Sequence, residues 1–103
     1  MKTLIASILL SLVAAAASAA AVQDEMIACS DREDLYHLVR IAQDQGSQMF
    51  MANALRLAKG GQCRFLHKGQ KVEINQTHWM GTVCVEGDDF EGCLWVVRDV
   101  ITE

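Results

Sequence analysis

Apolar residues follow three successive patterns along the chain. Residues 4–13 form an almost unbroken apolar run, and residues 32–59 repeat apolar positions at helical spacing. After Cys63, apolar and polar residues alternate. Periods of 3.6 and 2 residues indicate amphipathic helices and half-buried strands, respectively. The pattern therefore predicts a leader, two helices and a set of short strands, in that order.

The helical region predicts a hairpin over residues 29–61. Ser30 and Glu33 have the spacing of a capping box at the start of the first helix. Gly46 marks the turn between the helices. The second helix is apolar around much of its circumference, which predicts that it is wedged between the first helix and another element. The apolar face of the first helix comprises Leu35, Leu38, Val39 and Ala42.

Residues 63–103 predict four or five short strands. Val72 and Ile74 alternate with polar neighbours, and residues 82–85 and 93–97 are rich in residues that favour strands. Residues 22–28 carry no comparable pattern and are expected to form a short lead-in. Because helices and strands are segregated along the chain, the sequence predicts an α+β fold in which the helices come first.

The apolar run has the layout of a secretory signal peptide over residues 1–19. Lys2 supplies the positive end, and the residues before Ala19 supply a small-residue cleavage site, with a cut after Ala21 as the second choice. An uncleaved membrane anchor over residues 4–22 is the alternative, although its alanine-rich half would insert weakly. The expected location is periplasmic or secreted.

Length and charge restrict the class of the mature protein. A cut after Ala19 leaves 84 of the 103 residues, enough for a single domain over residues 20–103. Lys2 is the only charged residue that the cut removes, so the net charge changes from −4 to −5. An acidic domain is a poor ligand for nucleic acid. So small a domain has a marginal core, which disulfides would reinforce.

Four cysteines allow three connectivities. Two antiparallel helices of similar length would bring Cys29, before the first, close to Cys63, after the second. Cys84 and Cys93 flank an eight-residue segment between two strand-like runs, so they could pair across a hairpin. We therefore favour the pairs Cys29–Cys63 and Cys84–Cys93. A zinc site is the rival interpretation, but the chain has no C-x2-C spacing and an exported chain meets oxidants.

Two segments of the β region resemble a bacterial SH3-like domain. Residues 66–74 combine a leucine, a glycine turn and an alternating strand, and residues 92–97 resemble the late strand of that fold. The mature chain is also similar to small exported bacterial proteins of unknown function. The resemblance implies an N-terminal helical hairpin packed on a small SH3-like antiparallel β-barrel over residues 63–103, with two disulfides.

Catalytic, cofactor and metal motifs do not stand out in the sequence. His37, His67 and His78 lack the spacing of metal ligands. If all four cysteines are bridged, no thiol nucleophile remains. We therefore expect a protein that is not an enzyme and that holds no cofactor or metal.

A carboxylate-rich segment between the last two cysteines is the main candidate binding region. It is either a solvated hairpin tip or a rigid acidic loop that would meet a cleft lined by lysine or arginine. Trp79, at a predicted bend, is a second candidate contact, suited to a glycan or a peptide. The carboxylates are Glu86, Asp88, Asp89 and Glu91.

Two functions are compatible with these features. The favoured one is a non-catalytic interaction module that binds an envelope protein, such as a cell-wall enzyme. The alternative is an SH3-like module that binds peptidoglycan or another glycan. Neither function requires stable membrane insertion after cleavage.

Overall fold

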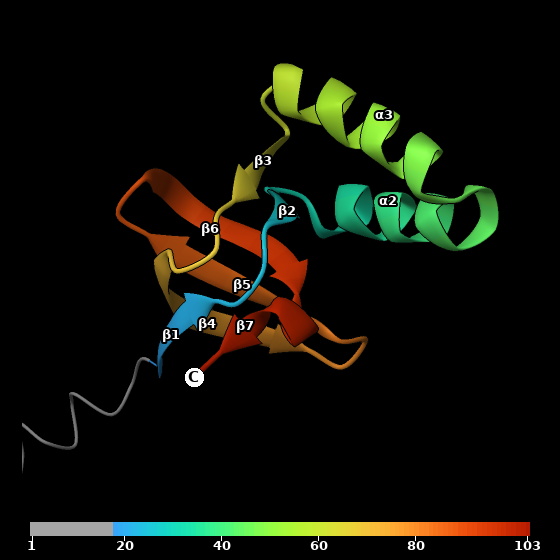
Figure 1. The fold of residues 1–103 in the computed structure, drawn as a ribbon. Coiled ribbons are helices and arrows are strands. Elements are labelled where there is room, and N and C mark those ends of the chain that lie inside the picture. The colour runs from blue at the N-terminus through green and yellow to red at the C-terminus, as the bar shows by residue number, and fades with distance from the viewer. Residues whose placement is uncertain (1–17) are drawn as a thin grey trace, which may run out of the picture.

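The structure, a computed structural model, describes residues 18–103. Within them, a seven-stranded antiparallel sheet has the strand order β3-β2-β6-β5-β4-β1-β7 and curls into a half-barrel (Figure 1). The strands are β1 (Ser18–Val22), β2 (Met26–Cys29), β3 (Cys63–Leu66), β4 (Lys71–His78), β5 (Thr82–Gly87), β6 (Phe90–Val97) and β7 (Ile101–Thr102). The helices are α2 (Arg32–Gln45), α3 (Ser47–Lys59) and the short 3-10 helix η1 (Arg98–Val100). No helix in this part of the chain is both long enough and apolar enough to cross a membrane.

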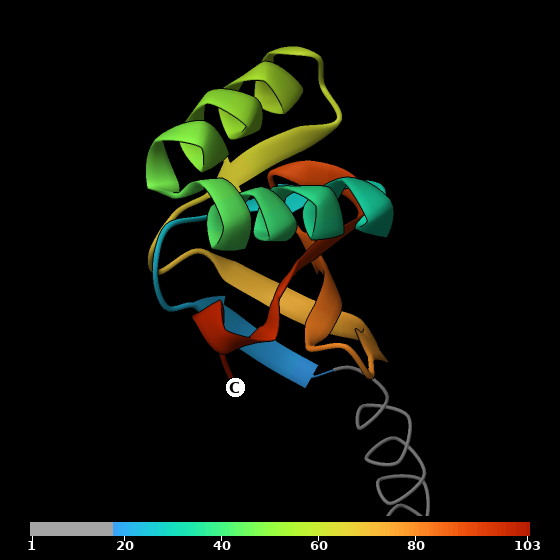
Figure 2. The same cartoon turned by 90° about the vertical axis from the view of Figure 1, so that its right-hand side faces the viewer.

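The expected N-terminal helical hairpin on a separate SH3-like barrel is wrong. Strands β1 and β2 precede the helices, and they pair with strands from the C-terminal half: β1 lies between β4 and β7, and β2 between β3 and β6. Helices α2 and α3 are therefore an insertion between two neighbouring strands of one sheet (Figure 2). The predicted leader falls mostly on residues 1–17, outside the described residues.

The predicted lead-in over residues 22–28 also proved to be strand, and burial explains why its pattern was missed. Ile27, Ala28 and Cys29 are all fully buried, because β2 has helices against one face and the half-barrel interior against the other. A strand buried on both faces shows no alternation of apolar and polar residues. Four residues without alternation give too weak a signal to predict a strand.

Both helices lie close to the predicted positions, with a different cap. The side chain of Asp31, rather than Ser30, caps α2 and accepts a hydrogen bond from the Glu33 N–H at 2.9 Å. Gly46 joins the helices with a φ of 89°, a conformation that favours glycine. The expected wedging of α3 is wrong, because Met51 and Leu55 on its outer face are about half exposed, at 46% and 48%.

Two apolar cores lie on opposite faces of the sheet. The inner core fills the half-barrel, and the outer core lies between the helices and strands β2, β3 and β6. The inner core is built on Val22, Ala28, Leu66, Val72, Val83, Val85, Leu94 and Val96. The outer core is built on Ile27, Cys29, Leu35, Leu38, Ala54, Leu57 and Cys63.

Both predicted disulfides are confirmed. Cys29 and Cys63 lie directly opposite each other on β2 and β3, with Cα atoms 4.0 Å apart, so their bond closes the helical insertion at its base. Cys84 bonds to Cys93 diagonally across β5 and β6, with Cα atoms 5.5 Å apart. A chain whose cysteines are all paired fits an oxidising, extracytoplasmic compartment.

Candidate binding surface

The β5–β6 hairpin divides the four candidate carboxylates between two places. Its turn is only Asp88 and Asp89, because the strands extend to Gly87 on one side and from Phe90 on the other. Glu86 and Asp88 border a hollow above strands β1 and β4, whereas Asp89 and Glu91 border a separate, smaller hollow near β3. The segment therefore does not present one continuous acidic tip.

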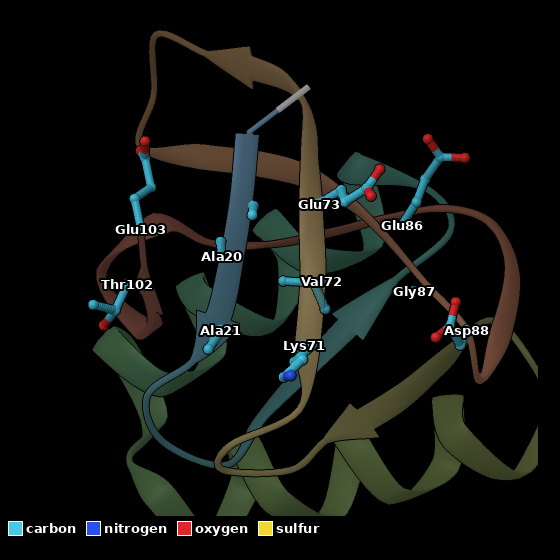
Figure 3. Close-up of a pocket in the computed structure, with 11 residues that line it drawn as sticks. Ala20, Ala21, Lys71, Val72, Glu73, Glu86, Gly87, Asp88, Thr102 and Glu103 are labelled. Atoms are coloured by element: carbon cyan, nitrogen blue, oxygen red, sulfur yellow. The ribbon is translucent and has the colours of Figure 1, made fainter. Parts of the chain in front are cut away.

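The hollow above β1 and β4 has a volume of about 730 Å³. Figure 3 shows alanines of β1 along its floor, with Glu73 and Glu86 on one side and Thr102 and Glu103 on the other. We call this hollow the acidic trough. Its charged residues are Lys71, Glu73, Glu86, Asp88 and Glu103.

Strand register explains why the trough forms. Ala21 lies between Lys71 of β4 and Thr102 of β7, and Ala19 lies beside Glu73. Side chains of paired residues project from the same face of a sheet. A row of methyl groups between longer side chains leaves an open channel, so the alanine content of β1 creates the trough.

Charge in the trough is strongly one-sided. Four exposed carboxylates border the trough beside one exposed ammonium, that of Lys71, and one of the four, Glu103, is already paired with Arg98 at 2.9 Å. Glu73 and Glu86 lie directly opposite each other on β4 and β5, an arrangement that like charges disfavour. The Asn75 amide donates a hydrogen bond to Glu86 at 2.8 Å and fixes that carboxylate. The net negative potential attracts cationic groups.

Of the other two carboxylates of the hairpin, Asp89 has structural neighbours. Asp89 accepts hydrogen bonds from Arg64 at its backbone carbonyl, at 3.0 Å, and from Gln70 at its carboxylate, at 3.3 Å. The Arg64 guanidinium also lies 5.5 Å from the centre of the Phe90 ring. These contacts attach the hairpin to β3 and to the loop before β4, so this side of the hairpin is tied to the fold.

Trp79 belongs to a second surface, at the other end of β5 from the acidic trough. Trp79 and Met80 form the tip of the β4–β5 hairpin and are 86% and 54% exposed. Behind them, the Tyr36 hydroxyl is 2.9 Å from His78 Nδ1, and the His78 and Trp79 ring centres are 5.7 Å apart. We call Tyr36, His78, Trp79 and Trp95 the aromatic corner.

Arg32 holds the aromatic corner against helix α2. Its guanidinium lies 5.3 Å from the centre of the Trp95 ring and 6.0 Å from that of Tyr36. Trp95 is half-buried and packs against the outer core. Tyr36, His78 and Trp95 are therefore a supported platform from which Trp79 projects.

The three histidines lie in separate environments. His37 is exposed on α2, His67 pairs with Glu25 at 3.1 Å, and His78 belongs to the aromatic corner. Across residues 18–103, no three His, Cys, Asp or Glu side chains are grouped as metal ligands.

The chain matches no protein-family model, no curated protein and no solved structure. The resemblance to small exported bacterial proteins therefore stays a prediction.

The sequence alone indicated two of the four carboxylates of the trough. Glu86 and Asp88 were singled out because they lie among other acidic residues. Glu73 and Glu103 are isolated acidic residues in the sequence, and only the pairing of β4 with β5 and of β1 with β7 brings them to the same surface. No feature of the sequence near Glu73 or Glu103 indicates that the two residues lie on the same surface.

Proposed function

We propose that the protein is a non-catalytic interaction module of the bacterial envelope. In this proposal, a basic segment of a partner protein binds in the acidic trough. The observation that carries it is the group of Glu73, Glu86 and Asp88 beside the single ammonium of Lys71, around a hollow with an alanine floor. The predicted leader and the two disulfides support a periplasmic or secreted location.

The shape of the trough suits lysine or arginine side chains. Their aliphatic stems would lie against the Ala21 methyl group, and their charged heads would reach the carboxylates at the sides. A cation placed between Glu73 and Glu86 would also relieve the repulsion of that pair. Natural proteins often retain such locally unfavourable arrangements where function needs them.

A glycan or peptidoglycan is the alternative ligand, at the aromatic corner. It is favoured by the 86% exposure of Trp79, because an exposed indole offers an apolar face and a hydrogen-bond donor. The two ligands would use different ends of β5, so variants at one end separate the two functions.

A charge-matched pair of variants tests the trough. Oxidised mature protein is used to capture its partner from envelope extract, and the affinity of the purified pair is measured by calorimetry. We expect Glu73→Gln with Glu86→Gln to weaken binding at least tenfold, and added salt to weaken wild-type binding. Asp89→Asn with Glu91→Gln removes the same charge outside the trough and should change affinity less than threefold.

Stability measurements show whether a loss of affinity comes from damage to the fold. Glu86→Gln alone should leave the free energy of unfolding unchanged or raise it by a few tenths of a kcal/mol, because it removes a like-charge pair. Equal loss of affinity in the two double variants would contradict a site in the trough. Loss of binding only in Trp79→Ala would assign the ligand to the aromatic corner.

A further inference from the structure

The structure distinguishes between the two cleavage positions that the sequence allows. We propose that the exported protein begins at Ala20 and that its new α-amino group lies at one end of the acidic trough, beside Glu73. The inference rests on the proposed export of the chain. Hydrolysis of the Ala19–Ala20 bond consumes one water: Ala19 leaves with the leader as a carboxylate, and Ala20 keeps the amino group.

Strand β1 contains the residues that decide the position of the cut. Ala20 packs against the inner core, and Val22 within that core is only 2% exposed. Ala21 pairs with Lys71 on one side and with Thr102 on the other. These residues are therefore part of the folded domain.

The two cuts differ in what they leave of β1. A cut after Ala19 removes the pairs of Ser18 and Ala19 with β4, but it keeps Ala20 to Val22 and so preserves both pairs that β1 makes with β7. A cut after Ala21 keeps only Val22 of the strand and leaves the β4 edge uncovered opposite Ala20 and Ala21. An uncovered strand edge exposes unpaired backbone groups. The earlier cut therefore preserves more of the sheet than the later one.

Register also places the new amino group. Ala19 lies opposite Glu73, and Cα atoms of such paired residues are about 4.5–5.5 Å apart. The Val22 N–H donates to the Gln70 carbonyl at 2.9 Å, and hydrogen-bonded positions recur at every second residue of an antiparallel pair. The nitrogen of Ala20 is therefore directed towards β4, within reach of the Glu73 side chain.

The charges around this position favour an ammonium group. Glu73 from β4 and Glu86 from β5 lie side by side near Lys71, whereas Glu103, across the floor beyond β7, is paired with Arg98. An ammonium here relieves the repulsion between Glu73 and Glu86 and attaches the first residue of β1 to β4. The mature N-terminus is then an internal counter-charge at one end of the trough.

Two measurements test the inference separately from partner binding. The first is N-terminal sequencing and intact mass of the exported protein. A start at Ala20 supports the proposal, and a start at Val22 overturns it. An intact Met1 start in the membrane fraction would instead overturn the export on which the proposal rests.

The second measurement compares purified proteins that begin at Ala20, with a free or an acetylated amino group, and at Val22. We expect the Val22 protein to melt several degrees lower than the Ala20 protein. Acetylation should lower the melting temperature in wild type but not in Glu73→Gln. By NMR titration, the pKa of the α-amino group should lie above its ordinary value of about 7.7 and fall in Glu73→Gln. Equal melting of the three proteins, or the same effect of acetylation in both backgrounds, would overturn the proposal.

Discussion

Removing the Cys29–Cys63 disulfide is expected to lower the free energy of unfolding by about 4 kcal/mol. The bond spans 34 residues and closes the whole helical insertion, so its loss releases a long loop in the unfolded chain. Cys29 and Cys63 are buried at 0% and 4% exposure, so alanine is the suitable replacement at both positions. Chemical denaturation of the Cys29→Ala/Cys63→Ala protein measures the effect.

The second disulfide is the matched control. Cys84 and Cys93 are separated by 9 residues, and the same loop-entropy relation gives about 2.5 kcal/mol for the Cys84→Ala/Cys93→Ala protein. The first double variant should therefore melt about 5–10 °C below the second. If the second variant melted at the same temperature or lower, the bond at the base of the helical insertion would not be the stronger constraint.

Ile27→Ala is expected to lower the free energy of unfolding by about 2–5 kcal/mol. Ile27 lies on β2, is 0% exposed and packs in the outer core between the sheet and the helices. Truncation would leave a cavity at the place where the segment before the helices joins the sheet. The measurement is the free energy of unfolding from urea denaturation.

Leu55→Ala is the control for that substitution. Leu55 lies on the outer face of α3 and is 48% exposed, so its truncation should change stability by less than about 1 kcal/mol. An effect of Ile27→Ala no larger than that of Leu55→Ala would restore the interpretation of residues 22–28 as a lead-in. A large difference supports a sheet that incorporates strands from both sides of the helical insertion.

The elements with strong local signals could be predicted from the sequence. The helical period and the glycine at the turn located α2 and α3, and helix geometry then predicted the pairing of Cys29 with Cys63. These features depend on neighbours within a few residues. The order of elements in space depends on contacts between distant segments, which local patterns do not contain.

Strand β1 illustrates why the sheet was incomplete in the prediction. Its residues, Ser18–Val22, are mostly alanine, which has low strand propensity and is typical of the end of a signal peptide. Pairing with β4 and β7 overrides that propensity. The same small side chains form the floor of the acidic trough, so the missed strand and the incompletely predicted site have one cause.

Site-specific photo-crosslinking tests whether a partner docks in the acidic trough. A photoreactive residue replaces Thr102, in the trough, or Gln48, exposed on α3, in bacteria that export the protein. We expect a protein adduct from position 102 that disappears in Glu73→Gln/Glu86→Gln, and no adduct from position 48. Absence of an adduct at position 102, together with an adduct from a probe at Trp79, would contradict docking in the acidic trough.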